Sequence, residues 1–234
     1  MTFFADPAAL SQTVNLGAGT TNVLNIAGAV DHVSMDISGT ALTVGDQTTS
    51  GNLNLTLLNQ QNGATFDFGA GTADTVTLFA SSGFSNNANV SNIENVIGSS
   101  NADVITIGIN TNVTTVTGGL GADFITAGAG DDHVRFTSVA ESAAGPGRDQ
   151  VTGFDAVHDQ FVFDGVADMS SQQQVHFIDG ENFSGASSGP EARLTNLSGF
   201  DVVQIDTNGD GAADIEIQVV GLAGQLHDNN FFVV

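Results

Sequence analysis

Two adjacent nine-residue segments combine glycines, an aspartate and an aliphatic residue in a spacing that suits a hard cation. The first, Gly118–Thr126, reads Gly-Gly-Leu-Gly-Ala-Asp-Phe-Ile-Thr, and the second, Ala127–Arg135, repeats it with one glycine replaced by alanine. Glycine permits tight turns that expose carbonyl oxygens, and the aspartate adds a carboxylate oxygen. These are the oxygen ligands that Ca²⁺ prefers, so both segments predict calcium-binding turns.

Three further segments follow the same template, namely Gly17–Asn25, Gly69–Thr77 and Gly98–Thr106. Each has a small-residue turn, Asp or Asn at position six and an aliphatic residue at position eight. In the first of them Asn22 stands where an acidic residue would be expected, which weakens the case for an ion there. Repetition of this kind predicts stacked coils, each built from two repeats.

Successive turns of such a stack fall on opposite edges, so a shared ion needs turns two repeats apart. We therefore expect Asp103 and Asp123 to share one edge and one ion. Asp132 should face the other edge, with Asp149 as the carboxylate from the following coil. The complete set of candidate calcium ligands is Asp74, Asp103, Gly119, Gly121, Asp123, Gly128, Gly130, Asp132, Asp149, Asp206, Asn208, Asp210 and Asp214.

The last four of these candidates lie in a loop that begins like an EF-hand. Position twelve of that loop is Ile217, where an EF-hand needs a bidentate glutamate. The loop is therefore interpreted as a β-hairpin whose Asp206, Asn208, Asp210 and either Asp214 or Glu216 surround a cation. A solvated turn is the alternative, because Asn-Gly and Asp-Gly are common in hairpins without metal.

The elements that must position these turns are strands. Val33–Ile37, Leu53–Leu57 and Val113–Val116 alternate and are rich in Thr, Val, Ile and Leu, whereas no segment has a convincing helical period. Strands separated by Gly, Asn and Asp turns describe a stacked β-solenoid. After residue 145 the repeats stop, and bulky side chains are expected to form a cap: Phe154, Phe161, Phe163, Phe177, Phe183 and Phe200.

The composition excludes several classes of binding partner. There are 26 acidic residues against three basic ones, a net charge of -23, which disfavours nucleic acids and insertion into or binding to anionic membranes. At 41% hydrophobic residues the chain is too apolar for a disordered acidic tail. It has no cysteine, no conventional N-terminal secretory signal and no apolar run long enough to span a bilayer. Its natural partners are cations.

Signals for catalysis are weak. Gly185–Gly189 fits the Gly-x-Ser-x-Gly pattern but lies in a Gly/Ser loop without the strand and helix that a nucleophile elbow needs. The five histidines have no short zinc-binding spacing. Counting carboxylates cannot exclude a glycosidase, although no Trp or Tyr is present to stack a sugar. We therefore predict neither catalytic nor organic cofactor-binding residues.

Three segments carry a resemblance to a known family. Asp149–Phe161 reads Asp-Gln-Val-Thr-Gly-Phe-Asp-Ala-Val-His-Asp-Gln-Phe, Val203–Ile217 contains Asp-Thr-Asn-Gly-Asp-Gly-Ala-Ala-Asp between two strands, and Asp228–Val234 is acidic and then aliphatic. Together with the nonapeptides they resemble the RTX family, with a cap similar to that of serralysin-type proteases. The resemblance is strong over residues 98–234.

That resemblance implies an all-β fold: a right-handed parallel β-roll or β-solenoid with a C-terminal capping β-sandwich. It divides the chain into degenerate repeats (1–97), a calcium-binding β-roll (98–136) and a cap with a type I secretion signal (137–234). It also implies several Ca²⁺ ions, a type I exporter as partner and a secreted protein. Removing residues 228–234 is then expected to stop export but to spare calcium-induced folding.

Three functions fit these expectations. The first is an extracellular structural protein that meets copies of itself or a bacterial surface in a surface layer, filament or matrix. The second is the secretion and folding module of a larger exported enzyme, such as a metalloprotease or lipase. The third is an adhesin that uses Thr and Asn arrays. Because the chain begins with Met and ends at a signal-like tail, we expect no catalytic domain, which favours the first.

Overall fold

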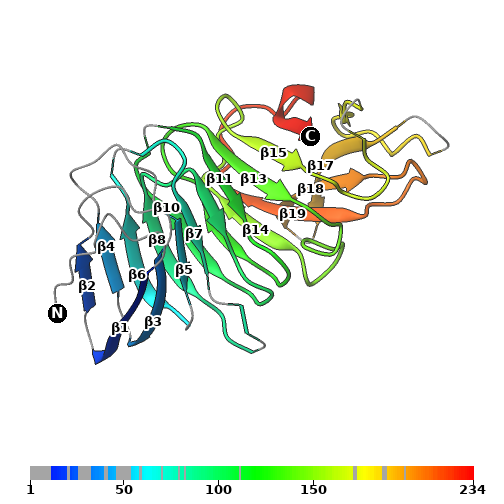
Figure 1. Ribbon diagram of the computed structural model, residues 1–234. Helices are drawn as coiled ribbons and strands as arrows, with labels where there is room; N and C mark the ends of the chain where they lie inside the picture. The colour runs from blue at the N-terminus through cyan, green and yellow to red at the C-terminus, as the bar shows by residue number, and fades with distance from the viewer. Residues whose placement is uncertain are drawn as a thin grey trace.

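The computed structural model describes residues 12–19, 22–25, 33–39, 42–45, 54–57 and 60–234, apart from positions 70, 79, 82, 111, 171–172, 186–188 and 198. Side chains are described from residue 54 onward. Within these residues the strands form two sheets that run side by side from the N-terminal end of the molecule to the C-terminal end (Figure 1). The predicted all-β architecture is confirmed.

Sheet A has nine strands in the described residues: β1 (Gln12–Gly19), β3 (Val33–Gly39), β5 (Asn54–Leu57), β7 (Thr75–Thr77), β9 (Asn95–Ile97), β11 (Thr114–Thr117), β13 (Asp132–Phe136), β15 (Gln160–Phe163) and β20 (Phe231–Val233). Sheet B has eleven: β2 (Asn22–Asn25), β4 (Leu42–Gly45), β6 (Asn62–Asp67), β8 (Asn87–Ser91), β10 (Val104–Ile107), β12 (Phe124–Thr126), β14 (Asp149–Thr152), β19 (Ile215–Val220), β18 (Phe200–Asp206), β17 (Glu191–Leu197) and β16 (His176–Phe177).

From β1 to β15 the chain alternates between the sheets, so each coil contributes one strand to each of them. Neighbouring coils pair in parallel, for example Ile105 with Ile125 in sheet B and Val116 with Val134 in sheet A. These aliphatic side chains are buried between the sheets, and the residues on either side of them point outward or into the turns. The position-eight residues whose side chains the structure describes, Val76, Ile105, Ile125 and Val134, are therefore part of the core, as the template predicts; Leu24 lies outside that part of the chain.

The C-terminal region continues both sheets. In sheet B, β19 pairs in parallel with β14, and β18 and β17 follow it in antiparallel order. Aromatic rings fill the space under this cap: Phe154 stacks on Phe161 at 4.3 Å between ring centroids, and Phe161 lies 5.9 Å from Phe231. The expectation that Phe200 joins this core is wrong. Its side chain is 52% exposed because it lies where the β17–β18 hairpin turns.

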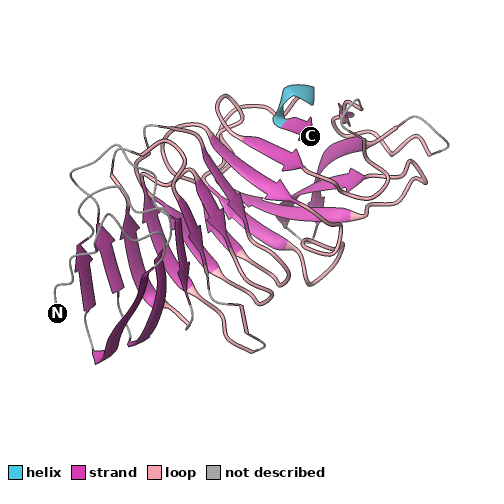
Figure 2. Cartoon of the chain, in the orientation of Figure 1, coloured by secondary structure: helices cyan, strands magenta, loops and turns pink. Residues whose placement is uncertain are grey.

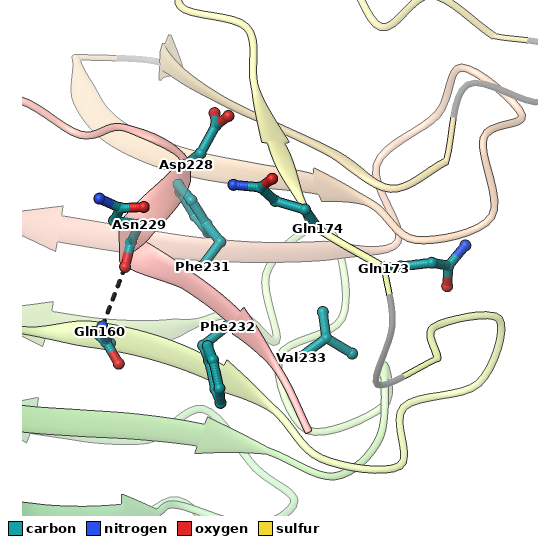
Figure 3. Close-up of a pocket in the computed structure, with 8 residues that line it drawn as sticks. All are labelled: Gln160, Gln173, Gln174, Asp228, Asn229, Phe231, Phe232 and Val233. Carbon is teal, nitrogen blue, oxygen red and sulfur yellow. Dashed lines mark hydrogen bonds between the residues drawn. The ribbon is translucent and has the colours of Figure 1, made fainter.

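The C-terminal tail is part of the same structure. A short 3₁₀ helix, η1 (Asp228–Asn230), leads into β20, which pairs with β15 (Figure 2). Beside a pocket of about 560 Å³, the Gln160 side chain donates a 3.2 Å hydrogen bond to the Asn229 carbonyl (Figure 3). The buried Asn230 side chain donates to two further carbonyls of the cap. The tail thus closes the end of sheet A.

In the part of the chain that the structure describes, no helix is long and apolar enough to cross a membrane.

Candidate metal centres

Three aspartates form a buried column along one edge of sheet B. Asp103, Asp123 and Asp149 stand at or just before the first residues of β10, β12 and β14, and at most 1% of each is exposed. The Asp103 amide donates to Asp123 Oδ1 at 2.7 Å, and the Asp123 amide donates to Asp149 Oδ1 at 2.8 Å. The Asn86 amide extends the column by donating to Asp103 Oδ1 at 2.7 Å. Asp103 and Asp123 therefore share an edge, as predicted.

A second column lies along the corresponding edge of sheet A. The Asp132 amide donates to Asp159 Oδ1 at 2.9 Å, and the Gly128 amide donates to Asp132 Oδ2 at 2.7 Å. The predicted pairing of Asp132 with Asp149 is wrong. Strands alternate between the sheets, so β13 stacks on β15 and β14 stacks on β12, which puts Asp149 in the column of Asp123.

Asp74 occupies the same edge of sheet A, nearer the N-terminal end of the stack. It is fully buried just before β7, and its amide donates to Glu94 Oε2 at 2.7 Å. Asn112 Nδ2 donates to the other oxygen of Glu94 at 2.9 Å. The structure therefore places Asp74 against Glu94 and not beside the other predicted ligands.

Burial controls the charge of these carboxyls. It raises the pKa of Asp123 to about 7 and that of Asp149 to about 8, with the neighbouring Asp103, Asp123 and Glu141 charges as smaller causes. Burial also raises the pKa of Asp132, and that of Asp159 to about 6. No ion pair of the described residues reaches Asp103, Asp123 or Asp149. An added cation would therefore stabilise the column.

One carboxylate oxygen of Asp123 is available to bind a cation. Its Oδ1 accepts the Asp103 amide, whereas its Oδ2 is buried and has no hydrogen-bond partner among the described residues. A buried carboxylate oxygen without a partner costs free energy unless a proton or a metal ion reaches it. This oxygen fits calcium, which takes hard anionic ligands.

The glycines of the turns are required by close stacking and by backbone conformation. Gly119, Gly121 and Gly130 have φ of +96°, +130° and +134°, where a Cβ is strained. A Cβ on Gly119 would overlap the Ser99 carbonyl oxygen, and one on Gly128 would overlap the Gly108 carbonyl oxygen. Carbonyls of one coil thus lie against glycines of the next.

The described residues contain no group of three or more acidic, His or Cys side chains that could hold a metal ion. Any calcium ion held by the columns would therefore need backbone carbonyl oxygens from the turns, which glycine-rich loops can present. The donor set is then one or two carboxylate oxygens with carbonyls, all of them hard ligands. It fits Ca²⁺.

The hairpin loop between β18 and β19 uses its polar groups differently. Asp206 is fully buried and accepts backbone amides from Asn208, Gly209 and Gly211 at 2.7 to 3.2 Å. Asp214 Oδ2 accepts the amide and hydroxyl of Thr207, both at 2.8 Å. Asp210 Oδ1 accepts the Ala212 amide at 2.9 Å. The loop is therefore held together by its own amides, as the carboxylates of the two columns are by theirs, and a cation among its acidic side chains stays a prediction.

Sequence reasoning missed Asp159 and Glu94, which belong to these edges, and Glu141, whose charge acts on Asp123 and Asp149. Asp159 Oδ2 accepts the amide four residues before it, that of Asp155, just as Asp132 Oδ2 accepts that of Gly128. Asp159 also precedes a buried aromatic residue, Phe161, by two positions. An aspartate two residues before a buried apolar side chain was therefore the available signal.

Comparison with protein families agrees with this geometry. Residues 35–234 match the family model described as Peptidase M10 serralysin C terminal. The chain belongs to this family. The family is the RTX-repeat β-roll region of serralysin-type proteins, so the resemblance seen in the motifs is confirmed. The match begins at residue 35, well before residue 98, and so includes much of the degenerate repeat region. No curated protein matches the chain.

Membership of this family indicates the broad class of protein. The family model describes the non-catalytic C-terminal domain of serralysin-type metalloproteases, an RTX calcium-binding secretion module of exported proteins. The Gly185–Gly189 pattern adds nothing to this, because its central residues lie outside the described ones.

Proposed function

We propose that this chain is a calcium-operated folding module, which leaves the cell extended through a type I exporter and folds outside. The column of buried carboxylates on sheet B carries the proposal. Asp103, Asp123 and Asp149 stack with no basic side chain to neutralise them, and Asp123 Oδ2 has no hydrogen-bond partner among the described residues. A fold that buries such groups needs a cation at neutral pH.

The free energy of calcium binding is large enough to control whether the chain folds. Extracellular calcium modules bind with dissociation constants of about 10⁻⁴–10⁻³ M, so sites of this class stay empty at low calcium. At ten times the dissociation constant, each site contributes about 1.4 kcal/mol to folding. Three or four sites then supply a free energy comparable to the whole stability of a typical domain.

The ligands we propose follow from the two edges. On sheet B, Asp103 and Asp123 would each give a carboxylate oxygen, with carbonyls of the turn that contains Gly119 and Gly121. On sheet A, Asp132 would act with carbonyls of the turn that contains Gly128 and Gly130. When bound, calcium supplies the positive charge that these buried carboxylates lack. We assign the chain no catalytic residue of its own.

The test is reversible folding of the full chain. Far-UV circular dichroism should show a β spectrum in calcium that chelator converts to a disordered one, and added calcium should restore it. Magnesium at the same concentration should restore much less, because it demands a tighter octahedral site. A thermal transition that is unchanged by chelator would show that the aliphatic core suffices without the metal.

A second candidate function is self-assembly at the cell surface. Within the described residues β1 and β2 end sheets A and B, each paired on one side only. Such an end can accept another coil, whether from a second copy in a layer, filament or matrix or from a preceding domain of a larger exported enzyme. Size-exclusion chromatography and electron microscopy with and without calcium separate the two. Ordered calcium-dependent assemblies favour self-assembly, and a monomer favours the module.

A further inference from the structure

A groove of about 530 Å³ lies on the outward face of sheet B, on the opposite side of the strands from the core. Its apolar lining comes from Phe124 of β12, from Leu197 and Phe200 at the turn of the β17–β18 hairpin, and from Pro146. Phe124 is 49% exposed and Phe200 is 52% exposed. Two half-exposed phenylalanine rings in one concave surface make this groove a candidate binding site.

The polar groups of the groove are arranged in register. Gln150 of β14 stands between Phe124 and Gln218 across the strands, and Gln218 Nε2 donates to Gln150 Oε1 at 3.1 Å. Arg148 Nη2 pairs with Glu216 at 2.8 Å, which cancels its charge, while the buried Arg148 Nε has no hydrogen-bond partner among the described residues. The groove is therefore neutral.

The surface that leads to the groove is also uncharged, although the chain carries 26 acidic residues. The described outward-facing residues of β8, β10, β12 and β14 are Asn87, Asn89, Ser91, Val104, Thr106, Phe124, Thr126, Gln150 and Thr152. An acidic polymer would be repelled by the net charge of -23, and a basic one would be drawn to the acidic turns. A neutral ligand suits this strip.

We propose that the groove binds a neutral oligosaccharide segment of an extracellular polymer. A sugar ring has an apolar C–H face, which Phe124 and Phe200 can cover. It also has hydroxyls that both donate and accept, which the Gln150 and Gln218 amides can meet. The chain contains no Trp or Tyr, so phenylalanine supplies all of its aromatic surface.

A peptide is the poorer occupant. β12, β14 and β19 are each paired on both sides, so a peptide lying on their face cannot add to the sheet through its backbone. Its amides would lose water and find few partners. The row formed by Thr106, Thr126 and Thr152 continues from β10 to β14 beside the groove and offers further hydroxyls to a linear glycan.

Affinity electrophoresis of the calcium-loaded full chain tests this proposal. Gels would contain neutral glucans, mannans or galactans, with alginate as an acidic glycan and a polyproline peptide as competitor. We expect retardation by at least one neutral glycan, with a tenfold or greater loss of affinity in Phe124→Ala and in Phe200→Ala. Phe232→Ala is the matched control, because its ring is 55% exposed on the outward face of sheet A.

The outcomes separate this site from the calcium sites. Calcium-induced folding, followed by circular dichroism, should be the same in all three variants because the rings are exposed. No retardation by any neutral glycan would overturn the proposal, as would binding to alginate alone, displacement by polyproline alone, or equal losses in Phe232→Ala. Loss of folding in chelator bears only on the calcium switch.

Discussion

Replacing Asp123 by Asn should have opposite effects on the calcium-free and the calcium-bound protein. The substitution keeps the shape of the side chain and an oxygen that can accept the Asp103 amide, now 2.7 Å from Asp123 Oδ1. It removes the charge and the anionic ligand oxygen. We therefore expect Asp123→Asn to stabilise the folded apo state at alkaline pH and to reduce the further stabilisation that calcium gives.

The size of the effect follows from the carboxyl's environment. Burial raises the pKa of Asp123 from 3.8 to about 7, so ionising it in the folded apo protein at pH 8 costs about 4 kcal/mol. Asparagine avoids that cost, but its amide group takes the place of Asp123 Oδ2, which has no partner, at a penalty of about 1–3 kcal/mol. The apo state should gain about 1–3 kcal/mol. The calcium-bound state should lose at least the contribution of one site.

Urea unfolding at pH 8, in chelator and in saturating calcium, measures both changes. Sulfate can be added to all samples if the apo protein is otherwise unfolded. Asp201→Asn is the control, because Asp201 is exposed in the β17–β18 hairpin and should change neither value. If Asp123→Asn destabilised the protein equally with and without calcium, its charge would be neither a burden to the apo fold nor a ligand, and the reasoning would fail.

Three further predictions follow from the same structure. Burial raises the folded pKa values of Asp123 and Asp149 above their unfolded value of 3.8, so apo stability should be greatest at about pH 4 or below and should fall as pH rises towards 8. The calcium midpoint should rise on acidification, because protons compete with calcium for these carboxylates, and circular dichroism at several pH values checks both expectations. Gly121→Ala should destabilise the calcium-bound protein by about 1–3 kcal/mol, since its φ is +130° and the new Cβ would lie 2.6 Å from the Ala102 nitrogen. Gly147 has open space around it, so Gly147→Ala should leave the stability unchanged in the same urea unfolding assay. Phe231→Ala should lower the free energy of unfolding by about 3–5 kcal/mol because the ring is buried against Phe161. The neighbouring Phe232→Ala should change it by less than about 1 kcal/mol, and equal losses would contradict the packing of the tail.

Much of the fold was predictable because one template recurs along the chain. An aliphatic residue at position eight, such as Ile105 or Ile125, must face the core in every coil, and this fixes both the strand and its register. The cap is less periodic, so the sequence shows how many aromatic residues it contains but not which of them are buried. Phe200 reads like Phe161 in the sequence, yet one lies at an exposed hairpin turn and the other in the core.

The candidate site was predictable in part. Shared edges follow from the alternation of strands, which brings Asp103 and Asp123 together. The same rule assigns Asp149 to their column. The connection between β13 and β14 does not repeat, however, so the number of coils between Asp123 and Asp149 could not be counted from the sequence. The hydrogen bonds that join the columns could not be foreseen, since they depend on which oxygen each amide reaches. Similarly, no pattern in the sequence shows that Asp206 accepts three backbone amides of its own loop.

If export proceeds as proposed, the position of the tail ties export to folding. Asp228–Val234 resembles a type I secretion signal, yet Phe231 and Val233 are buried and β20 pairs with β15. An exporter that reads this segment in extended form can therefore do so only while the cap is unfolded. This changes the expectation that the tail can be removed without harm to folding, because its loss would expose Phe161 at the open edge of sheet A. Low calcium before export would keep the tail accessible, and calcium outside would withdraw it into the sheet.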